Sequence, residues 1–142
     1  MKKGFTLVEI MIVVAIIALL AAIAIPNLLR ARLNANDAAA KADLQALVTA
    51  IESYAAANGE YPDDESDLTG ATPAYLNESF CGGSKHGYDF SCTLDTASYT
   101  VEASASSCNT SGSKHYAVTT GNVWVDPSDH STSAPNGVAC GG

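Results

Sequence analysis

The sequence is poor in cationic side chains. Lys and Arg together number 7 against 15 Asp and Glu, which gives a formal net charge of −8 at pH 7. Proteins that bind nucleic acid through their own surface need clustered Lys or Arg to contact phosphates. We therefore expect no direct binding of nucleic acid by this chain.

Sequence motifs typical of enzymes and metal sites are also missing. The chain has no G-x-S-x-G elbow, no H-E-x-x-H pair and no C-x-x-C pair. Its histidines are scattered and are expected at the surface: His86, His115 and His130. An acidic segment, residues 60–67, lacks the spacing of a calcium-binding loop and is interpreted as solvated. We expect no catalytic residue, no cofactor and no bound metal.

What the sequence does contain is a long apolar run near its start. As a helix rising about 1.5 Å per residue, Phe5 to Ile25 can cross the hydrocarbon core of a bilayer. Lys2 and Lys3 precede the run, and the positive-inside bias places everything after it outside the cytoplasm. A single carboxylate, Glu9, interrupts the run. Because an ionised group in a membrane-spanning segment costs about 2.5–3.5 kcal/mol on insertion scales, this position predicts a partner for the charge.

The order of residues at the start of this run resembles one family. The segment KKGFTLVE, residues 2–9, is closely similar to the processing site of type IV prepilins and pseudopilins. In that family a membrane peptidase cuts after the glycine that matches Gly4 and methylates the new amino terminus, which here is Phe5. The family's glutamate at the fifth mature position matches Glu9, and its helix-distorting proline matches Pro26. The resemblance implies a prepilin peptidase/methyltransferase as a partner.

Glu9 has a physical role in this interpretation. The amine of a processed Phe5 stays cationic after methylation, and Glu9 provides an anion one helical turn away or on a neighbouring subunit. Inside a helical bundle either charge alone is penalised, whereas the pair offsets part of the desolvation. We expect such pairs to set the axial register of identical subunits in a helical homopolymer. The alternatives are an ordinary single-pass anchor and a secretory signal cleaved after the small residues that end at Ala24.

The chain continues as helix beyond Pro26. Apolar residues follow the i, i+3, i+4, i+7 spacing of one helical face: Leu44, Leu47, Val48, Ile51 and Ala55. Asn58 and Gly59 form a helix stop. Because Pro26 lacks an amide hydrogen, it predicts a kink or a loosened turn, which either positions the following domain or permits stretching of a filament.

Residues 60–142 are rich in Ser, Thr, Gly and Asp, which indicates a small domain with a thin core. Alternating apolar residues predict a hairpin of strands 88–94 and 99–105, joined across 95–98. Two more strands are expected at 115–119 and 122–126, which makes a four-stranded antiparallel meander. Packed on the second half of the helix, this sheet gives an α+β fold with the ladle shape that the resemblance implies.

Four cysteines predict two disulfides in this extracytoplasmic domain: Cys81, Cys92, Cys108 and Cys140. In the expected hairpin Cys92 lies opposite Val101, about 20 Å from Cys108, so a bond between these two is disfavoured. Three pairings exist in principle. Of these we favour Cys81 with Cys108 and Cys92 with Cys140.

The sequence therefore divides into a cytoplasmic leader (1–4), a transmembrane and filament-core helix (5–25), an amphipathic helix (26–59) and an extracytoplasmic head (60–142). The resemblance implies a structural subunit of a type IV pilus that is stored in the inner membrane and polymerised by an assembly platform there. The surface filament would serve adhesion, twitching motility or DNA uptake. The alternatives are a pseudopilin of a type II secretion system and a minor pilin that primes or tips the fibre. Asp126 and Pro127 lack the Trp-Gly that follows in the pseudopilin calcium site, which favours the pilin.

Overall fold

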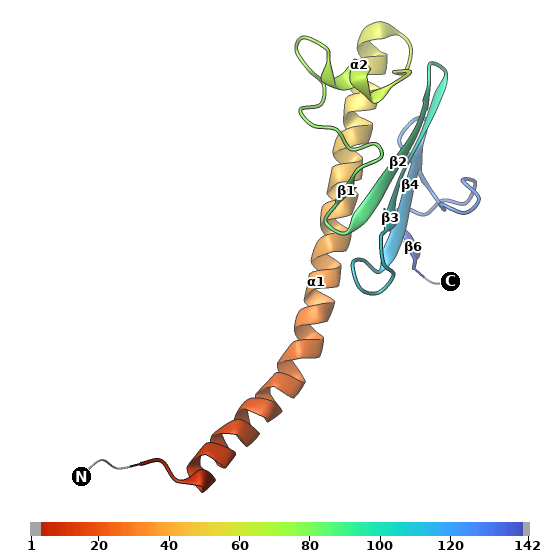
Figure 1. Ribbon diagram of the computed structural model, residues 1–142. Helices are drawn as coiled ribbons and strands as arrows, with labels where there is room; N and C mark the ends of the chain where they lie inside the picture. The colour runs from red at the N-terminus through yellow and green to blue at the C-terminus, as the bar shows by residue number, and fades with distance from the viewer. Residues whose placement is uncertain (1–3, 141–142) are drawn as a thin grey trace. The chain divides into compact units, whose positions relative to one another are not determined.

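The computed structural model describes residues 4–140, so that Lys2 and Lys3 lie outside the described residues. The chain divides into two compact units, one ending at Arg32 and one beginning at Leu33, and each is described by itself. The elements, labelled in Figure 1, are the helices α1 (Leu7–Asn58) and α2 (Glu65–Thr69) and the strands β1 (Ser84–Lys85), β2 (Tyr88–Asp95), β3 (Ser98–Ala105), β4 (Lys114–Thr119), β5 (Val123–Val125) and β6 (Val138–Ala139).

Helix α1 confirms the long helix that the sequence predicts. It contains Pro26 and ends at Asn58. Gly59 follows with a φ of +83°, a left-handed conformation that glycine adopts at little cost and that ends helices.

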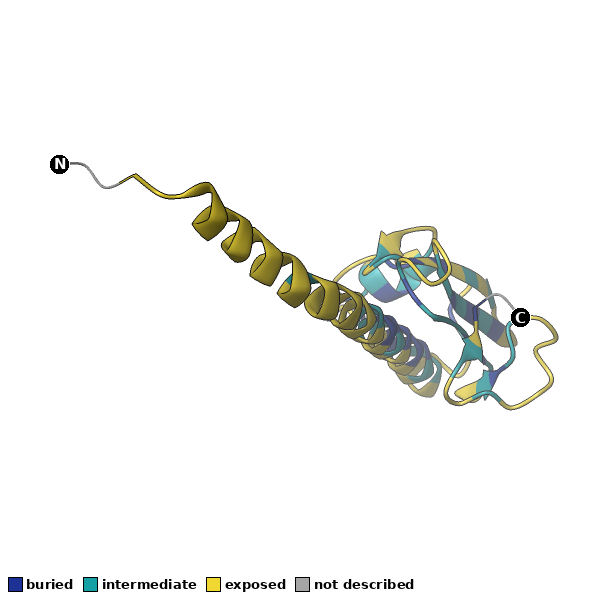
Figure 2. Cartoon of the chain, turned by 90° about the horizontal axis from the view of Figure 1, so that it is seen from below, coloured by how far each residue is buried: buried dark blue, intermediate teal, exposed yellow. Residues whose placement is uncertain are grey.

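The core of the second unit lies between α1 and one face of the sheet (Figure 2). The predicted apolar face is confirmed, because Leu44, Leu47, Val48 and Ile51 are all 0% exposed. Aromatic side chains fill the opposite side of this core: Phe80, Tyr88, Phe90, Tyr99 and Tyr116. These large rings provide buried apolar area in a domain that has few large aliphatic residues.

Within residues 4–140 the sheet has six strands rather than the four expected. Its order is β1-β2-β3-β4-β5, with β6 pairing with β4, and each of these strand pairs is antiparallel. The predicted β2–β3 hairpin is confirmed, including Cys92 opposite Val101, and so is the β4–β5 hairpin. The two extra strands, β1 and β6, each have two residues. Segments this short show no alternation of apolar and polar residues, so the sequence pattern gave no signal for them.

The two predicted disulfide pairings are wrong. Cys81 is bonded to Cys92, and Cys108 is bonded to Cys140. The cause lies in the two missed strands. The Gly82 N–H donates to the Phe90 carbonyl (2.9 Å), which places the chain before β1 beside β2 and Cys81 beside Cys92. At the other end of the domain, β6 pairs with the start of β4, and this brings Cys140 to the loop that carries Cys108.

The acidic segment is solvated at Glu60, Asp63 and Asp64, as predicted, but part of it forms the short capped helix α2 rather than a loop. Asp64 is the N-cap of α2 and accepts a hydrogen bond from the Ser66 N–H (2.8 Å), while Asp67 accepts one from the Asp64 N–H (3.3 Å). Glu65 accepts hydrogen bonds from the N–H groups of Phe80 (2.6 Å) and Cys81 (3.1 Å). Asp64 and Asp67 therefore cap α2, and Glu65 orders the backbone at Cys81 of the first disulfide.

Candidate functional site

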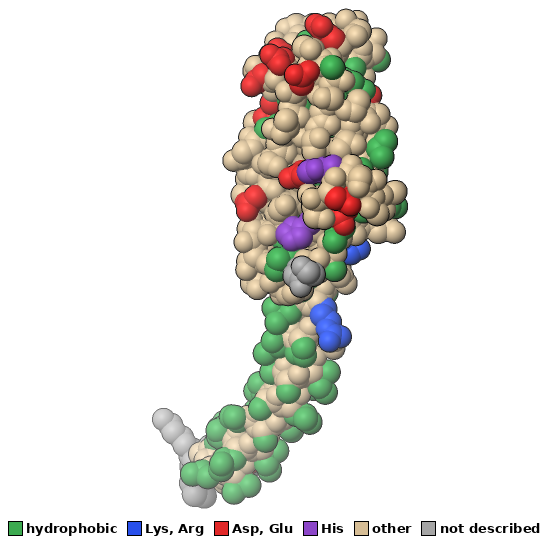
Figure 3. Space-filling model, turned by 90° about the vertical axis from the view of Figure 1, so that its right-hand side faces the viewer, with side chains coloured by type: hydrophobic (Ala, Val, Ile, Leu, Met, Phe, Trp, Pro, Cys, Tyr) green, Lys and Arg blue, Asp and Glu red, His purple; other side chains and the backbone are tan. Residues whose placement is uncertain are grey.

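The first unit exposes a continuous apolar surface. From Phe5 to Leu29 every large apolar side chain is at least half exposed, with values from 50% for Ile10 to 85% for Phe5. Figure 3 shows these hydrophobic side chains covering the first part of α1. Among the described residues, α1 is the one helix long and apolar enough, by length and composition, to cross a membrane. An apolar surface of this extent marks contact with lipid or with other protein.

A capping box begins α1. The Glu9 carboxylate accepts hydrogen bonds from the backbone N–H (2.8 Å) and the hydroxyl (2.7 Å) of Thr6. In return, the Thr6 hydroxyl oxygen accepts one from the Glu9 N–H (3.3 Å). The negative charge of Glu9 thus lies at the positive end of the helix dipole. This second role of Glu9 was not predicted, although the T-x-x-E spacing of residues 6–9 is its signal.

The predicted processing site lies before the helix. Gly4 and Phe5 are both exposed, and a Cβ atom added to Gly4 would meet nothing within 4 Å. No packing among residues 4–140 therefore requires glycine at this position, and cleavage there stays a prediction. The kink at Pro26 also stays a prediction. Beside Pro26, the Asn27 side chain donates a hydrogen bond to the Ile23 carbonyl (3.0 Å).

Within the second unit, a buried carboxylate attaches the sheet to α1. Asp37 is 7% exposed and accepts hydrogen bonds from the Tyr88 hydroxyl (2.6 Å), the Ser113 N–H (2.9 Å) and the Ser113 hydroxyl. Burial pushes the pKa of Asp37 upward, but the hydrogen bonds from Ser113 and Tyr88 outweigh this effect and lower the pKa below its usual value. Asp37 is therefore ionised and satisfied, and it ties α1 to the start of β2 and β4.

A second carboxylate on α1 does the same at the other end of the sheet. Glu52 accepts hydrogen bonds from the Tyr99 hydroxyl (2.7 Å) and the Gly121 N–H (3.1 Å), and the Tyr99 oxygen accepts one from the Asn122 N–H (3.0 Å). Fifteen residues of helix separate the two carboxylates, or about 22 Å. Sequence reasoning missed both anchors, although Asp37 lies in the stripe of Ala40 and Leu44, where a buried charge needs partners.

One group of side chains has the composition of a metal site. Cys108, His115 and Cys140 bring their ligand atoms within 4.8 Å of one another. Both sulfur atoms are used in a disulfide, however, and His115 Nδ1 accepts a hydrogen bond from the Ala105 N–H (3.2 Å). The ring nitrogen that faces Cys108 Sγ at 3.6 Å, Nε2, then carries the hydrogen and has no lone pair for a metal. This group does not fit a metal ion.

The remaining candidate metal ligands each hold another partner. Asp126 and Asp129 accept hydrogen bonds from the N–H groups of Ser128 (2.8 Å) and Ser131 (2.9 Å), and these bonds form turns between β5 and β6. Backbone hydrogen bonds from Ser131 and Thr132 lower the pKa of Asp129 to about 2. The two more exposed histidines each contact a carboxylate: His86 with Asp43 (2.9 Å) and His130 with Glu102 (2.5 Å).

Comparison with known proteins adds to these observations. Residues 1–25 match a family described as the prokaryotic N-terminal methylation motif. Over 90 residues the chain is 43% identical to the type IV wide pilus major component PilA4 of Thermus thermophilus, a match that covers 61% of this chain and 69% of the relative.

Two further relatives match over shorter stretches. The type IV major pilin protein PilA of Myxococcus xanthus is 45% identical over 67 residues, which are 47% of this chain and 30% of that protein. The type II secretion system core protein G of Aeromonas hydrophila is 37% identical over 67 residues, 47% of each chain. The match with these two relatives thus spans less than half the length of each.

Proposed function

The chain belongs to the type IV pilin family, and on this premise we propose that it is a structural subunit of a type IV pilus. The observation that carries the proposal is the continuous apolar surface from Phe5 to Leu29, which a single chain in water leaves uncovered. Lipid covers such a surface in a stored precursor, and identical segments of other copies cover it in a filament. A filament subunit of this kind works through its packing, so we expect no enzymatic activity.

The precursor is held in the inner membrane by residues 5–25, with the head on the extracytoplasmic side. The prepilin peptidase/methyltransferase cuts after Gly4 and methylates Phe5. Both residues precede α1 and are exposed, which suits entry of this segment into a peptidase site. Cleavage removes Lys2 and Lys3, and with them two charges that oppose withdrawal of the helix from the membrane. An assembly platform in the inner membrane then adds the subunit to the filament.

Assembly pairs the new amine of Phe5 with Glu9 of an adjacent copy. In the single chain Glu9 caps its own helix through Thr6, so its charge is already oriented toward the end of α1 where the amine appears. A carboxylate has lone pairs for both the Thr6 groups and an incoming ammonium. The pair fixes the axial register of neighbouring helices, because either charge left alone in the apolar filament core is strongly unfavourable. Pro26 loosens the helix between the core and the head.

A second candidate function is a pseudopilin of a type II secretion system. The similarity to core protein G of Aeromonas hydrophila favours it, and the same assembly chemistry serves both kinds of filament. The match to PilA4 extends over more residues than the match to core protein G, which favours the pilus. A minor pilin that primes or tips the fibre is a third possibility within the family.

The intact mass of the protein from cell membranes and from a sheared cell-surface fraction tests the proposal. We expect a species that begins at methylated Phe5 and is abundant in the sheared fraction. The same species confined to the cell envelope would instead indicate a pseudopilin. A mature protein that begins beyond Ala24 would contradict both, because the apolar segment would then be a discarded signal.

A further inference from the structure

Two arginines on α1 are the cationic side chains that the described residues leave without a partner. No hydrogen bond or ion pair joins Arg30 or Arg32 to any other described residue, and both are exposed. The three described lysines are each held by a neighbour: Lys41 by the Pro135 carbonyl (2.7 Å), Lys85 by Glu78 (2.8 Å) and Lys114 by the Asn136 carbonyl (2.9 Å). The arginines are therefore available to a partner outside the chain.

The position of the two arginines also points to a partner outside the chain. They follow directly after Leu29, the last large exposed apolar residue of α1. Residues two positions apart in sequence are about 200° apart around an α-helix, so the guanidinium groups of Arg30 and Arg32 project to opposite sides of α1. A chain placed among identical copies thus presents one cation to a neighbour on either side.

Asp89 provides a negative charge that can pair with these arginines. It is exposed, and its side chain makes no hydrogen bond or ion pair with another described residue. It follows Tyr88, whose side chain points toward α1 and reaches Asp37, so alternation along β2 turns Asp89 to the outer face of the sheet. Asp89 therefore lies on the surface, at the end of β2 whose first residue, Tyr88, is hydrogen-bonded to Asp37 near the start of the second unit.

The proposed pairing of Phe5 with Glu9 places the two arginines of one copy beside the start of the second unit of another copy, and the inference rests on that proposal. Pairing across four residues offsets two copies by about 6 Å along the helix axis. Arg30 and Arg32 of one copy then come level with about residues 34–36 of the other. At this level the second unit begins, because the Asn36 side chain donates a hydrogen bond to the Ser111 carbonyl (2.6 Å) and Asp37 follows.

We propose that Arg30 and Arg32 contact the heads of the two adjacent copies on either side of α1, each arginine pairing with Asp89 of one of these heads. The charge balance supports this choice. Loss of Lys2 and Lys3 leaves 5 basic against 15 acidic side chains, since 7 minus 2 is 5. Identical subunits with this excess of negative charge repel one another, and opposite charges placed across the contact both relieve the repulsion and fix the register.

A charge exchange between the two sites tests the inference in the native host. The double variant Arg30→Glu with Arg32→Glu is expected to reach the membrane and to be processed at the wild-type level. Its yield of sheared filaments should fall about tenfold or more, because like charges then face each other across the contact. Adding Asp89→Arg should return the yield to within about twofold of wild type. The variant Arg30→Lys with Arg32→Lys should assemble nearly normally.

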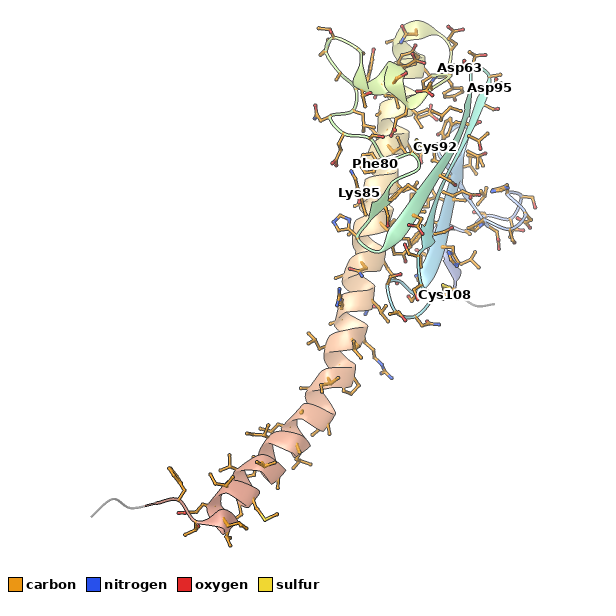
Figure 4. The ribbon with its side chains drawn as sticks, in the orientation of Figure 1. Asp63, Phe80, Lys85, Cys92, Asp95 and Cys108 are labelled. Carbon is orange, nitrogen blue, oxygen red and sulfur yellow. A yellow bond between two sulfur atoms is a disulfide. The ribbon has the colours of Figure 1, made fainter. Side chains whose placement is uncertain are left out.

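The matched control is Asp63→Arg in the same double variant. Asp63 is also exposed and accepts no described hydrogen bond, but it lies beside the far end of β2, near Asp95 (Figure 4). It changes the net charge by the same amount as Asp89→Arg does, and it should not restore assembly. If it restores assembly as well as Asp89→Arg does, the effect is one of total charge and the inference is wrong.

Other outcomes would also contradict the inference. Normal filaments from the glutamate double variant would overturn it while leaving the pilus function intact, whereas absence of filaments from the wild-type chain would refute the function itself. A loss of protein from the membrane, without rescue by Asp89→Arg, would show that the arginines bind anionic lipid headgroups instead. A photo-cross-linking residue at position 32 gives an independent measurement that leaves Asp89 unchanged. In sheared filaments it should capture the peptide that contains Asp89 of another copy, and capture of other peptides alone would contradict the assignment.

Discussion

Replacement of Asp37 by alanine is expected to be among the most destabilising single changes in the head. The side chain is 7% exposed and accepts three hydrogen bonds, one from Tyr88 and two from Ser113. A hydrogen bond to a charged group contributes about 1.5–3 kcal/mol, and removal of the carboxylate leaves buried donors without an acceptor. In the variant, water can partly replace the carboxylate as the acceptor for these donors. We therefore expect the free energy of unfolding to fall by about 3–5 kcal/mol, a large part of the ~5–15 kcal/mol typical of a domain.

The assay is denaturant unfolding of the full chain in detergent, followed by the fluorescence of the single tryptophan. Trp124 is a local probe, because its ring lies 6.2 Å from that of Tyr116 and under Lys41 Nζ at 5.1 Å. Tyr88→Phe removes one of the three bonds and should cost about 1.5–3 kcal/mol. Asp63→Ala, an exposed carboxylate without a described partner, should change stability by less than about 0.5 kcal/mol.

The pH dependence gives the same prediction a second test. Because hydrogen bonds lower the pKa of Asp37 in the folded chain, its contribution to stability is present above the unfolded pKa of about 3.9 and is lost as the pH falls through the folded value. Asp37→Asn should therefore be less stable than wild type at neutral pH and should lose less stability on acidification. An Asp37→Ala variant within about 0.5 kcal/mol of wild type would refute the idea that this carboxylate anchors the sheet.

The remaining predictions concern processing, assembly, the disulfides and alkaline pH. Gly4→Val should leave an unprocessed precursor in the membrane, detected by its mass. Glu9→Ala should still be cleaved but should reduce filament yield, and normal filaments would disprove the charge-pair argument. Peptide mapping without reductant should recover Cys81 linked to Cys92 and Cys108 linked to Cys140. Burial raises the pKa of Tyr116 to about 12, so this tyrosine's contribution to stability is complete below pH ~10 and is lost as the pH rises toward 12. Thermal unfolding between pH 8 and 12 would show this loss, and a constant melting temperature would contradict it.

The helix and the main hairpins could be predicted because their patterns are long. A continuous apolar run followed by an amphipathic stretch leaves few alternatives to helix, and β2 and β3 each have eight residues in which alternation can be recognised. Strands β1 and β6 are two residues long and depend on tertiary contacts that no local pattern encodes. The wrong disulfide pairing followed from these missed strands, since cysteine spacing alone does not select one pairing.

The candidate site shows the same division between local and tertiary information. The methylation motif is a local pattern, and its match over residues 1–25 agrees with the predicted family. Asp37 acts through Tyr88 and Ser113, which are 51 and 76 residues away in sequence, so its role depends on how the sheet is placed on α1. The α2 cap and the Thr6–Glu9 capping box are local and lay within reach of sequence reasoning. Both were missed because the acidic residues of segment 60–67 were interpreted as solvated and Glu9 was interpreted as an assembly partner.

The central claim is that the exposed apolar segment of this chain becomes the core of a filament. A helical reconstruction of sheared filaments from the native host tests it most directly. We predict that residues 5–25 of neighbouring copies pack together along the axis, with the Phe5 amine within about 4 Å of the Glu9 carboxylate of an adjacent copy, the usual distance of an ion pair. Filaments in which the heads form the contacts while residues 5–25 lie outside the core would contradict the account.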